Sequence, residues 1–129
     1  MTSPDGLQHI VLTMARCPEF PEGSERHGYS LRAPLDALGF IDPVRWKETR
    51  THCVVRRFWG DEPARHGMLV HSPDGTTGAT WAFDYDPDRA SDDEAGYRLG
   101  EHAFIPGEYV SVRDEGGAMH SFVVKSVDG

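Results

Sequence analysis

The chain of 129 residues is short of positive charge and of long apolar runs. It holds 13 lysine and arginine residues against 21 aspartate and glutamate residues, which gives a net charge of −8. Phosphate backbones and anionic lipid surfaces repel such a chain, so we expect neither nucleic acid nor a membrane surface as a partner. No run approaches the roughly 18 apolar residues that a membrane-spanning helix needs.

Cysteine and lysine are also scarce. Cys17 and Cys53 are the only cysteines, and they form no Cys-x-x-Cys motif, so neither a disulfide framework nor a zinc knuckle is indicated. The sequence opens without a basic segment before an apolar run, which does not indicate a signal peptide. We therefore expect free thiols and a cytoplasmic location. Lys47 and Lys125 are the only lysines, and this arginine bias is typical of a GC-rich bacterial genome.

The length predicts a single domain spanning residues 1–129 and excludes large catalytic scaffolds. Short segments with period-two alternation of apolar and polar residues are typical of half-buried strands. The segments with strand-like composition, from which six to seven strands are expected, cover residues 7–14, 28–33, 53–59, 67–71, 80–86, 102–105, 108–114 and 119–127. The sequence predicts a mainly β fold, a small antiparallel barrel or strongly bent sheet of six to seven strands with one short helix.

Three other local patterns interrupt the strands. Asp42 followed by Pro43 is a helix-start signal, and it predicts a helix over residues 43–51 with Val44 and Trp46 turned toward the core. Residues 34–38 are expected to form one helical turn that Gly39 ends. Residues 87–96 are polar and acidic, which predicts a long solvated loop rather than a metal site.

Seven histidines raise the question of a metal site. His102 and His120 fall on nearby predicted strands at the end of the chain, and they are the candidate metal ligands because imidazoles from different strands can converge. The competing interpretation is that isolated histidines on strands and loops are structural, and we expect no cofactor.

One constellation combines charge with aromatic side chains. Arg56, Arg57 and Trp59 lie on one predicted strand, and Trp81 and Asp84 lie on another. A cleft with a guanidinium and aromatic walls would accept a small anion through paired hydrogen bonds. The alternative is a structural ion pair between an arginine and a carboxylate.

Two segments near the end of the chain, residues 96–114 and 120–127, show a resemblance to a known family. Three earlier motifs share it: Ala33-Pro-Leu-Asp, Arg57-Phe-Trp and Trp81-Ala-Phe-Asp-Tyr-Asp. These motifs resemble a family of short bacterial proteins of unknown function, over most of the chain. The resemblance implies no activity, so no functional residue is transferred.

The sequence contains no phosphate-binding glycine motif and no matched set of nucleophile, base and acid. It therefore favours a non-catalytic binding or accessory module that takes a small anion or a protein partner. The alternative is a small enzyme that uses histidine and carboxylate groups, with or without a metal.

Overall fold

The computed structural model describes residues 7–71, 81–85, 94–97, 103–113 and 118–128. The elements in these ranges are β1 (Gln8–Met14), β2 (Ser24–Ala33), α1 (Pro43–Thr49), the 3-10 turn η1 (Arg50–His52), β3 (Val54–Trp59), β4 (Glu62–His71), β5 (Trp81–Asp84), β6 (Glu94–Tyr97), β7 (Tyr109–Arg113) and β8 (Met119–Asp128).

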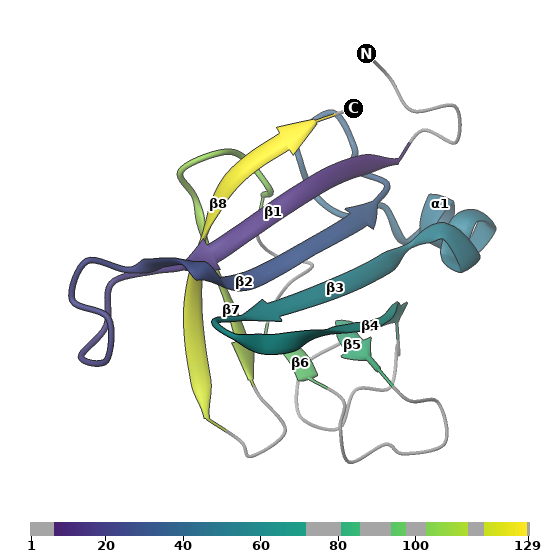
Figure 1. Cartoon of the computed structure of the whole chain (residues 1–129). Helices are drawn as coiled ribbons and strands as arrows, with labels where there is room; N and C mark the ends of the chain where they lie inside the picture. Colours follow the sequence, from purple (N-terminus) through teal and green to yellow (C-terminus); the bar gives the residue numbers. More distant parts are fainter. Residues whose placement is uncertain (1–6, 72–80, 86–93, 98–102, 114–117, 129) are drawn as a thin grey trace.

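Each strand pairs antiparallel with the next one along the chain, and β8 pairs back to β1, so the sheet closes into a barrel (Figure 1). The predicted mainly β antiparallel fold with one short helix is confirmed. The details differ in several places. Strand β2 begins at Ser24 and not at Gly28, and β4 begins at Glu62 and not at Gly67. Residues 94–97 form β6 although the sequence predicts a loop there, and residues 103–105 are not a strand. The rest of the predicted acidic loop lies outside the described residues.

Alternation along the strands separates a buried inner face from an outer face. Tyr29 stands at the centre of the interior, with ring centroids 4.9 Å from Phe83 and 5.1 Å from Phe122. The inward positions that are buried include Ile10, Leu12, Met14, Tyr29, Leu31, Val55, Leu69, Trp81, Phe83, Val110, Val112, Phe122 and Val124. Burial of these aliphatic and aromatic side chains is the main driving force for closing the barrel.

The short helix begins where the sequence predicts. The Asp42 carboxylate accepts hydrogen bonds from the backbone N–H groups of Val44 and Arg45, at 3.0 and 3.2 Å, and Pro43 starts the first turn. Trp46 is buried, as predicted. The prediction for Val44 is wrong: its side chain is 71% exposed, because its position in the first turn faces away from the barrel. Residues 34–38 form a turn and not a helical segment.

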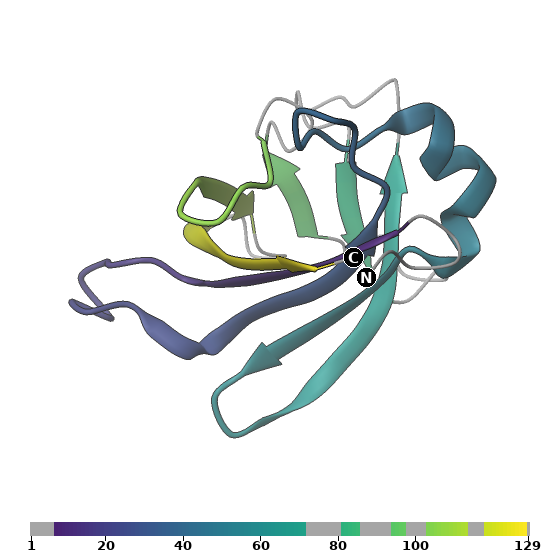
Figure 2. The ribbon, with the colours of Figure 1, turned by 90° about the horizontal axis from the view of Figure 1, so that it is seen from above.

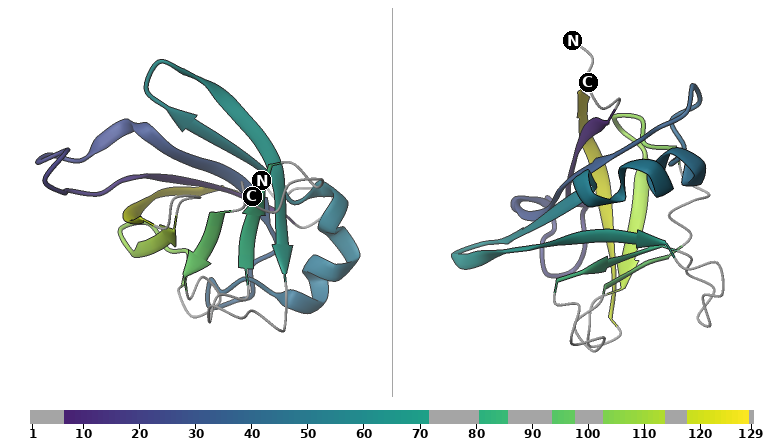
Figure 3. Two further views of the ribbon diagram at one scale, coloured as in Figure 1. Left: turned by 90° about the horizontal axis from the view of Figure 1, so that it is seen from below. Right: turned by 90° about the vertical axis from the view of Figure 1, so that its right-hand side faces the viewer.

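Helix α1 lies outside the strands, beside the start of β3 and the end of β4 (Figure 3). Trp46 connects it to the barrel through its indole N–H, which donates to the Leu69 carbonyl oxygen at 3.0 Å. The Trp46 ring also meets Trp81 edge-on, with centroids 5.5 Å apart. In the described residues, no helix has the length and apolar composition needed to cross a membrane.

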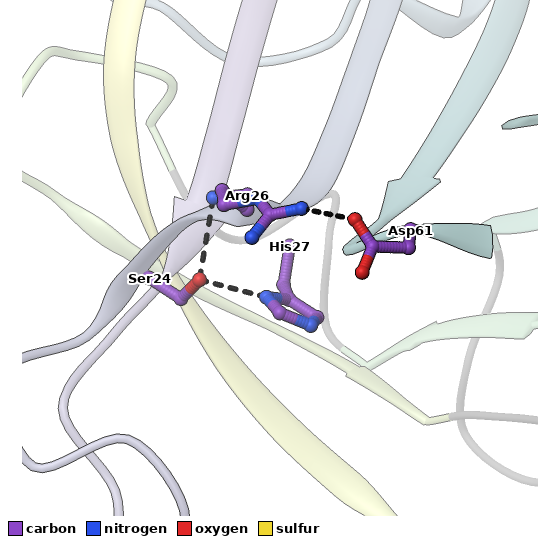
Figure 4. A network of polar contacts seen from close by, with 4 residues as sticks. All are labelled: Ser24, Arg26, His27 and Asp61. Carbon is purple, nitrogen blue, oxygen red and sulfur yellow. Dashed lines mark hydrogen bonds and ion pairs between the residues drawn. The ribbon is translucent and has the colours of Figure 1, made fainter.

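Two hairpins, β1–β2 and β3–β4, project from the side opposite α1 (Figure 2). Polar contacts join the turn between β3 and β4 to the first residues of β2 (Figure 4). The Arg26 guanidinium pairs with the Asp61 carboxylate, and the Gly60 N–H donates to the Arg26 carbonyl oxygen at 2.8 Å. Gly60 has φ of 58°, which is the left-handed region that this two-residue turn requires.

Gly28 allows β1 and β2 to approach closely next to an irregularity in their register. A Cβ atom at position 28 would lie 1.9 Å from the Leu12 carbonyl oxygen. The pairing shifts between Thr13 and Met14, at the same point along the strand. Only glycine fits there without moving the backbone.

Candidate functional site

Arg56 and Arg57 are consecutive residues of β3, so strand alternation sends their side chains to opposite faces. Val55 is buried in the core, and Arg57 and Trp59 share its inward face. Arg56 therefore points outward. On β5 the same rule places buried Trp81 inside and Asp84 outside. The five residues of the predicted anion site are thus divided between two faces of one barrel wall.

The outer face carries two parallel rows of side chains across the strands. One row contains His9 opposite Arg32 on β1 and β2, and Val54, Met68 and Asp84 opposite one another on β3, β4 and β5. Arg32 and Val54 each lie one residue beyond the paired Leu31 and Val55, which brings the two parts of the row together. Neighbours in such a row have Cβ atoms about 4.5–5.5 Å apart.

The adjacent row crosses β1 to β4. It contains Val11, Ser30, Arg56 and His66, each opposite the next. The two rows are linked by a hydrogen bond of 2.6 Å between His9 Nε2 and Ser30 Oγ. A fixed His9 ring therefore borders this part of the face.

A groove of about 600 Å³ lies over these two rows. Its volume falls within the range of sites for small molecules, which is about 300–1,000 Å³. Val54 and Met68 give it an apolar middle. The side chains with polar groups that line it are His9, Ser30, Arg32, Arg56, His66, Asp84 and Tyr85.

The charge of the groove is opposite to that of the whole chain. Arg32 and Arg56 contribute two positive charges, and Asp84 contributes one negative charge, in a protein with a net charge of −8. Among the described residues, neither arginine forms an ion pair with a carboxylate, so the structural Arg56–Asp84 pair considered from the sequence is not formed. Both guanidinium groups present donors to a ligand in the groove.

Asp84 lies at the β5 end of the groove, and its Oδ1 atom is buried without a hydrogen-bond partner. A carboxylate in this condition repels a second negative charge strongly, because little water screens the pair. Asp84 therefore disfavours an anionic group over β5 and favours one over β2 and β3.

The predicted site residues on the inward face of β3, Arg57 and Trp59, belong to a different cluster. The Arg57 guanidinium stacks on the Trp59 ring, 4.1 Å from its centroid. Trp59 also meets His27 edge-on at 4.9 Å and His120 at 5.8 Å. Arg57 is paired across the strands with Arg65, whose guanidinium lies 4.4 Å from the Tyr85 centroid. Packing against rings is a structural use of these arginines.

The predicted metal ligands are His102 and His120. His120 packs against Trp59 on the inward side, and His102 lies outside the described residues. In the part of the chain that the structure describes, no three histidine, cysteine or acidic side chains are grouped as metal ligands. Neither Cys17 nor Cys53 forms a disulfide.

Sequence reasoning missed Arg32, Val54, His66 and Met68 as groove residues. Arg32 and Arg56 belong to different strands, and only the register that places Ser30 opposite Arg56 brings them to one face. The available signal was the alternation of Ser30 and Arg32 with Tyr29 and Leu31, which marks a polar outer face on β2.

No protein-family model, curated protein or solved structure matches this chain. The account of the site therefore depends on its geometry and charge.

Proposed function

We propose that this protein is a non-catalytic binding module that takes a small organic anion in the outer groove. The observation that carries the proposal is the pair Arg32 and Arg56, both without a carboxylate partner in the described structure, beside the apolar surface of Val54 and Met68. A carboxylate or phosphate group would accept hydrogen bonds from the guanidinium donors. The apolar part of the ligand would cover Val54 and Met68.

Three features support an anion with an apolar body over a bare inorganic ion. The side chain of Val54 is 45% exposed, and covering it removes apolar surface from water. Asp84 opposes negative charge at the β5 end, so the anionic group has one favoured end of the groove. The β strands hold the side chains on a hydrogen-bonded frame, which reduces the entropy lost on binding.

We place this module in a bacterial cytoplasm. Neither cysteine is in a disulfide, which suits a reducing compartment, and the arginine-rich composition suits a GC-rich genome.

A thermal-shift assay tests the proposed function. The wild-type protein is heated with millimolar butyrate, benzoate or inorganic phosphate, and a ligand that binds the folded state raises Tm. We expect a rise of several degrees with the organic anions in the wild type and no rise in Arg56→Ala. Arg16→Ala is the matched control, because Arg16 is exposed and lies outside the groove. Absence of any anion-dependent shift in the wild type contradicts the proposal.

A further inference from the structure

A second hollow, of about 400 Å³, adjoins the anion groove. It lies between the α1–η1 segment and β4. Its lining includes Trp46, Arg50, Thr51, Met68 and Val70. Met68 lines both hollows, so they meet at this side chain.

The two hollows follow one strand. His66, Met68 and Val70 alternate with inward Gly67 and Leu69 and therefore share the outer face of β4. At about 3.3 Å per residue, the distance from His66 to Val70 along the strand is about 13 Å. The surface runs from the Arg56 side of the groove, across Met68, to the α1–η1 segment.

The composition changes along this path. The end near His66 is polar and carries Arg56 in the neighbouring strand. The far end has the rings of Trp46 and His71 and the aliphatic side chain of Val70. Arg50 and Thr51 stand at its exposed rim. One end suits an anionic group and the other suits an apolar tail.

We propose that the ligand of the groove is an elongated amphiphilic carboxylate, whose tail crosses Met68 and lies in the hollow beside Trp46. This inference depends on the proposed function and names the ligand class for the same site. The carboxylate lies over Arg32 and Arg56, and Asp84 disfavours the reverse orientation. Arg50 stands at the exposed side of the far hollow, where the flexible guanidinium stays in water while its aliphatic stem lies along the tail.

The test is a chain-length series of acetate, butyrate, hexanoate and octanoate, titrated by calorimetry into the wild-type protein. Affinity rises about twofold to fourfold for each added methylene that the apolar surface covers. Intrinsic fluorescence provides a second readout. Octanoate changes the emission of Trp46 because its tail reaches that ring, and butyrate binds without this change. The Trp46→Phe variant identifies which tryptophan gives the signal.

Thr51→Glu places a charge at the rim of the far hollow. We expect it to remove the gain from butyrate to octanoate and to leave butyrate binding within about twofold of the wild type. Lys47→Gln is the matched control. It changes the net charge by the same amount, and Lys47 is exposed on α1 and lies outside the hollow.

The outcomes separate the two proposals. If butyrate and octanoate bind with equal affinity and Arg56→Ala binds neither, the proposal of an amphiphilic ligand is overturned and the proposed anion site is retained. A length dependence that Thr51→Glu does not reduce also overturns the inference, because the tail then lies elsewhere. If no carboxylate binds in an Arg56-dependent way, both proposals fail.

Discussion

The guanidinium groups of Arg56 and Arg57 lie on opposite sides of the barrel wall, although the two residues are adjacent in the chain. Arg57 stacks on Trp59 on the inward face, and its Nε atom is buried. Arg56 is exposed and stands in the outer groove between Ser30 and His66. The same substitution at the two positions therefore has different consequences.

We predict that Arg57→Ala destabilises the fold by roughly 1–3 kcal/mol, because it removes the stacking on Trp59 and leaves a gap inside the barrel. Arg56→Ala changes the free energy of unfolding by less than about 0.5 kcal/mol, as expected for an exposed side chain. Urea denaturation followed by circular dichroism measures both. Equal losses in the free energy of unfolding for the two variants would contradict the assignment of Arg57 to the inward face and Arg56 to the outer face.

Gly28 gives a steric prediction. In Gly28→Ala the new Cβ would overlap the Leu12 carbonyl oxygen, so β1 and β2 must separate at their register shift. We expect a loss of about 3 kcal/mol or more, or failure to fold.

Gly60→Ala is the comparison for this prediction. Its φ of 58° is unfavourable for alanine, and the nearest atom to the new Cβ is the side-chain nitrogen Nε2 of His27, at 3.2 Å, and not a backbone atom. We expect a cost near 1 kcal/mol. A Gly28→Ala protein as stable as Gly60→Ala would contradict the close approach of the two strands.

The barrel could be predicted from the sequence because period-two segments follow one another with turn residues between them. The segments that were missed lack this pattern. Residues 62–66 are Glu-Pro-Ala-Arg-His, which has no apolar alternation, yet they form the first half of β4 by pairing with β3. Residues 94–97 become β6 because β5 and β7 lie on either side of them. In both cases the neighbouring strands determine the structure.

The candidate site was predicted only in part, for a related reason. Both faces of β3 carry one arginine among apolar residues, so the local pattern does not indicate which face is inward. The burial of Val55 decides this, and it depends on the other strands. Arg56 and Asp84 do line the groove, and Arg57, Trp59 and Trp81 belong to the interior.

Trp46 gives a prediction about how the helix is held. The Leu69 carbonyl oxygen accepts a hydrogen bond from the Trp46 indole N–H, so Trp46→Phe keeps an aromatic ring and leaves this oxygen without that donor. We expect a loss of roughly 1–3 kcal/mol in the free energy of unfolding. Val44→Ala on the same helix, at an exposed position, changes it by less than about 0.5 kcal/mol. Thermal denaturation that gives similar Tm values for both variants would contradict the role of the indole.

Glu25 gives a prediction about pH. Lys125 donates a hydrogen bond of 2.7 Å to the Glu25 carboxylate, and this bond, together with the attraction of the charges, lowers the pKa of Glu25. A lowered pKa means that the pair stabilises the fold above the ordinary pKa of the carboxyl group and that this contribution is lost as pH falls through the folded value.

NMR titration measures the pKa of Glu25 directly. It should return to its ordinary range in Lys125→Ala, and the shift should shrink at high salt because both side chains are exposed. A pKa of Glu25 that is the same in wild type and variant would show that the pair does not form in solution.

The most direct test of the outer groove is an NMR titration of the amide signals with butyrate. The account predicts that the largest shifts occur at Arg32, Val54, Arg56 and Met68, that they saturate with one dissociation constant, and that they disappear in Arg56→Ala. Saturable shifts concentrated at Arg57, Trp59 and His120 would place the ligand inside the barrel, and the absence of saturable shifts would show that the groove binds no small carboxylate. Either result would contradict the account.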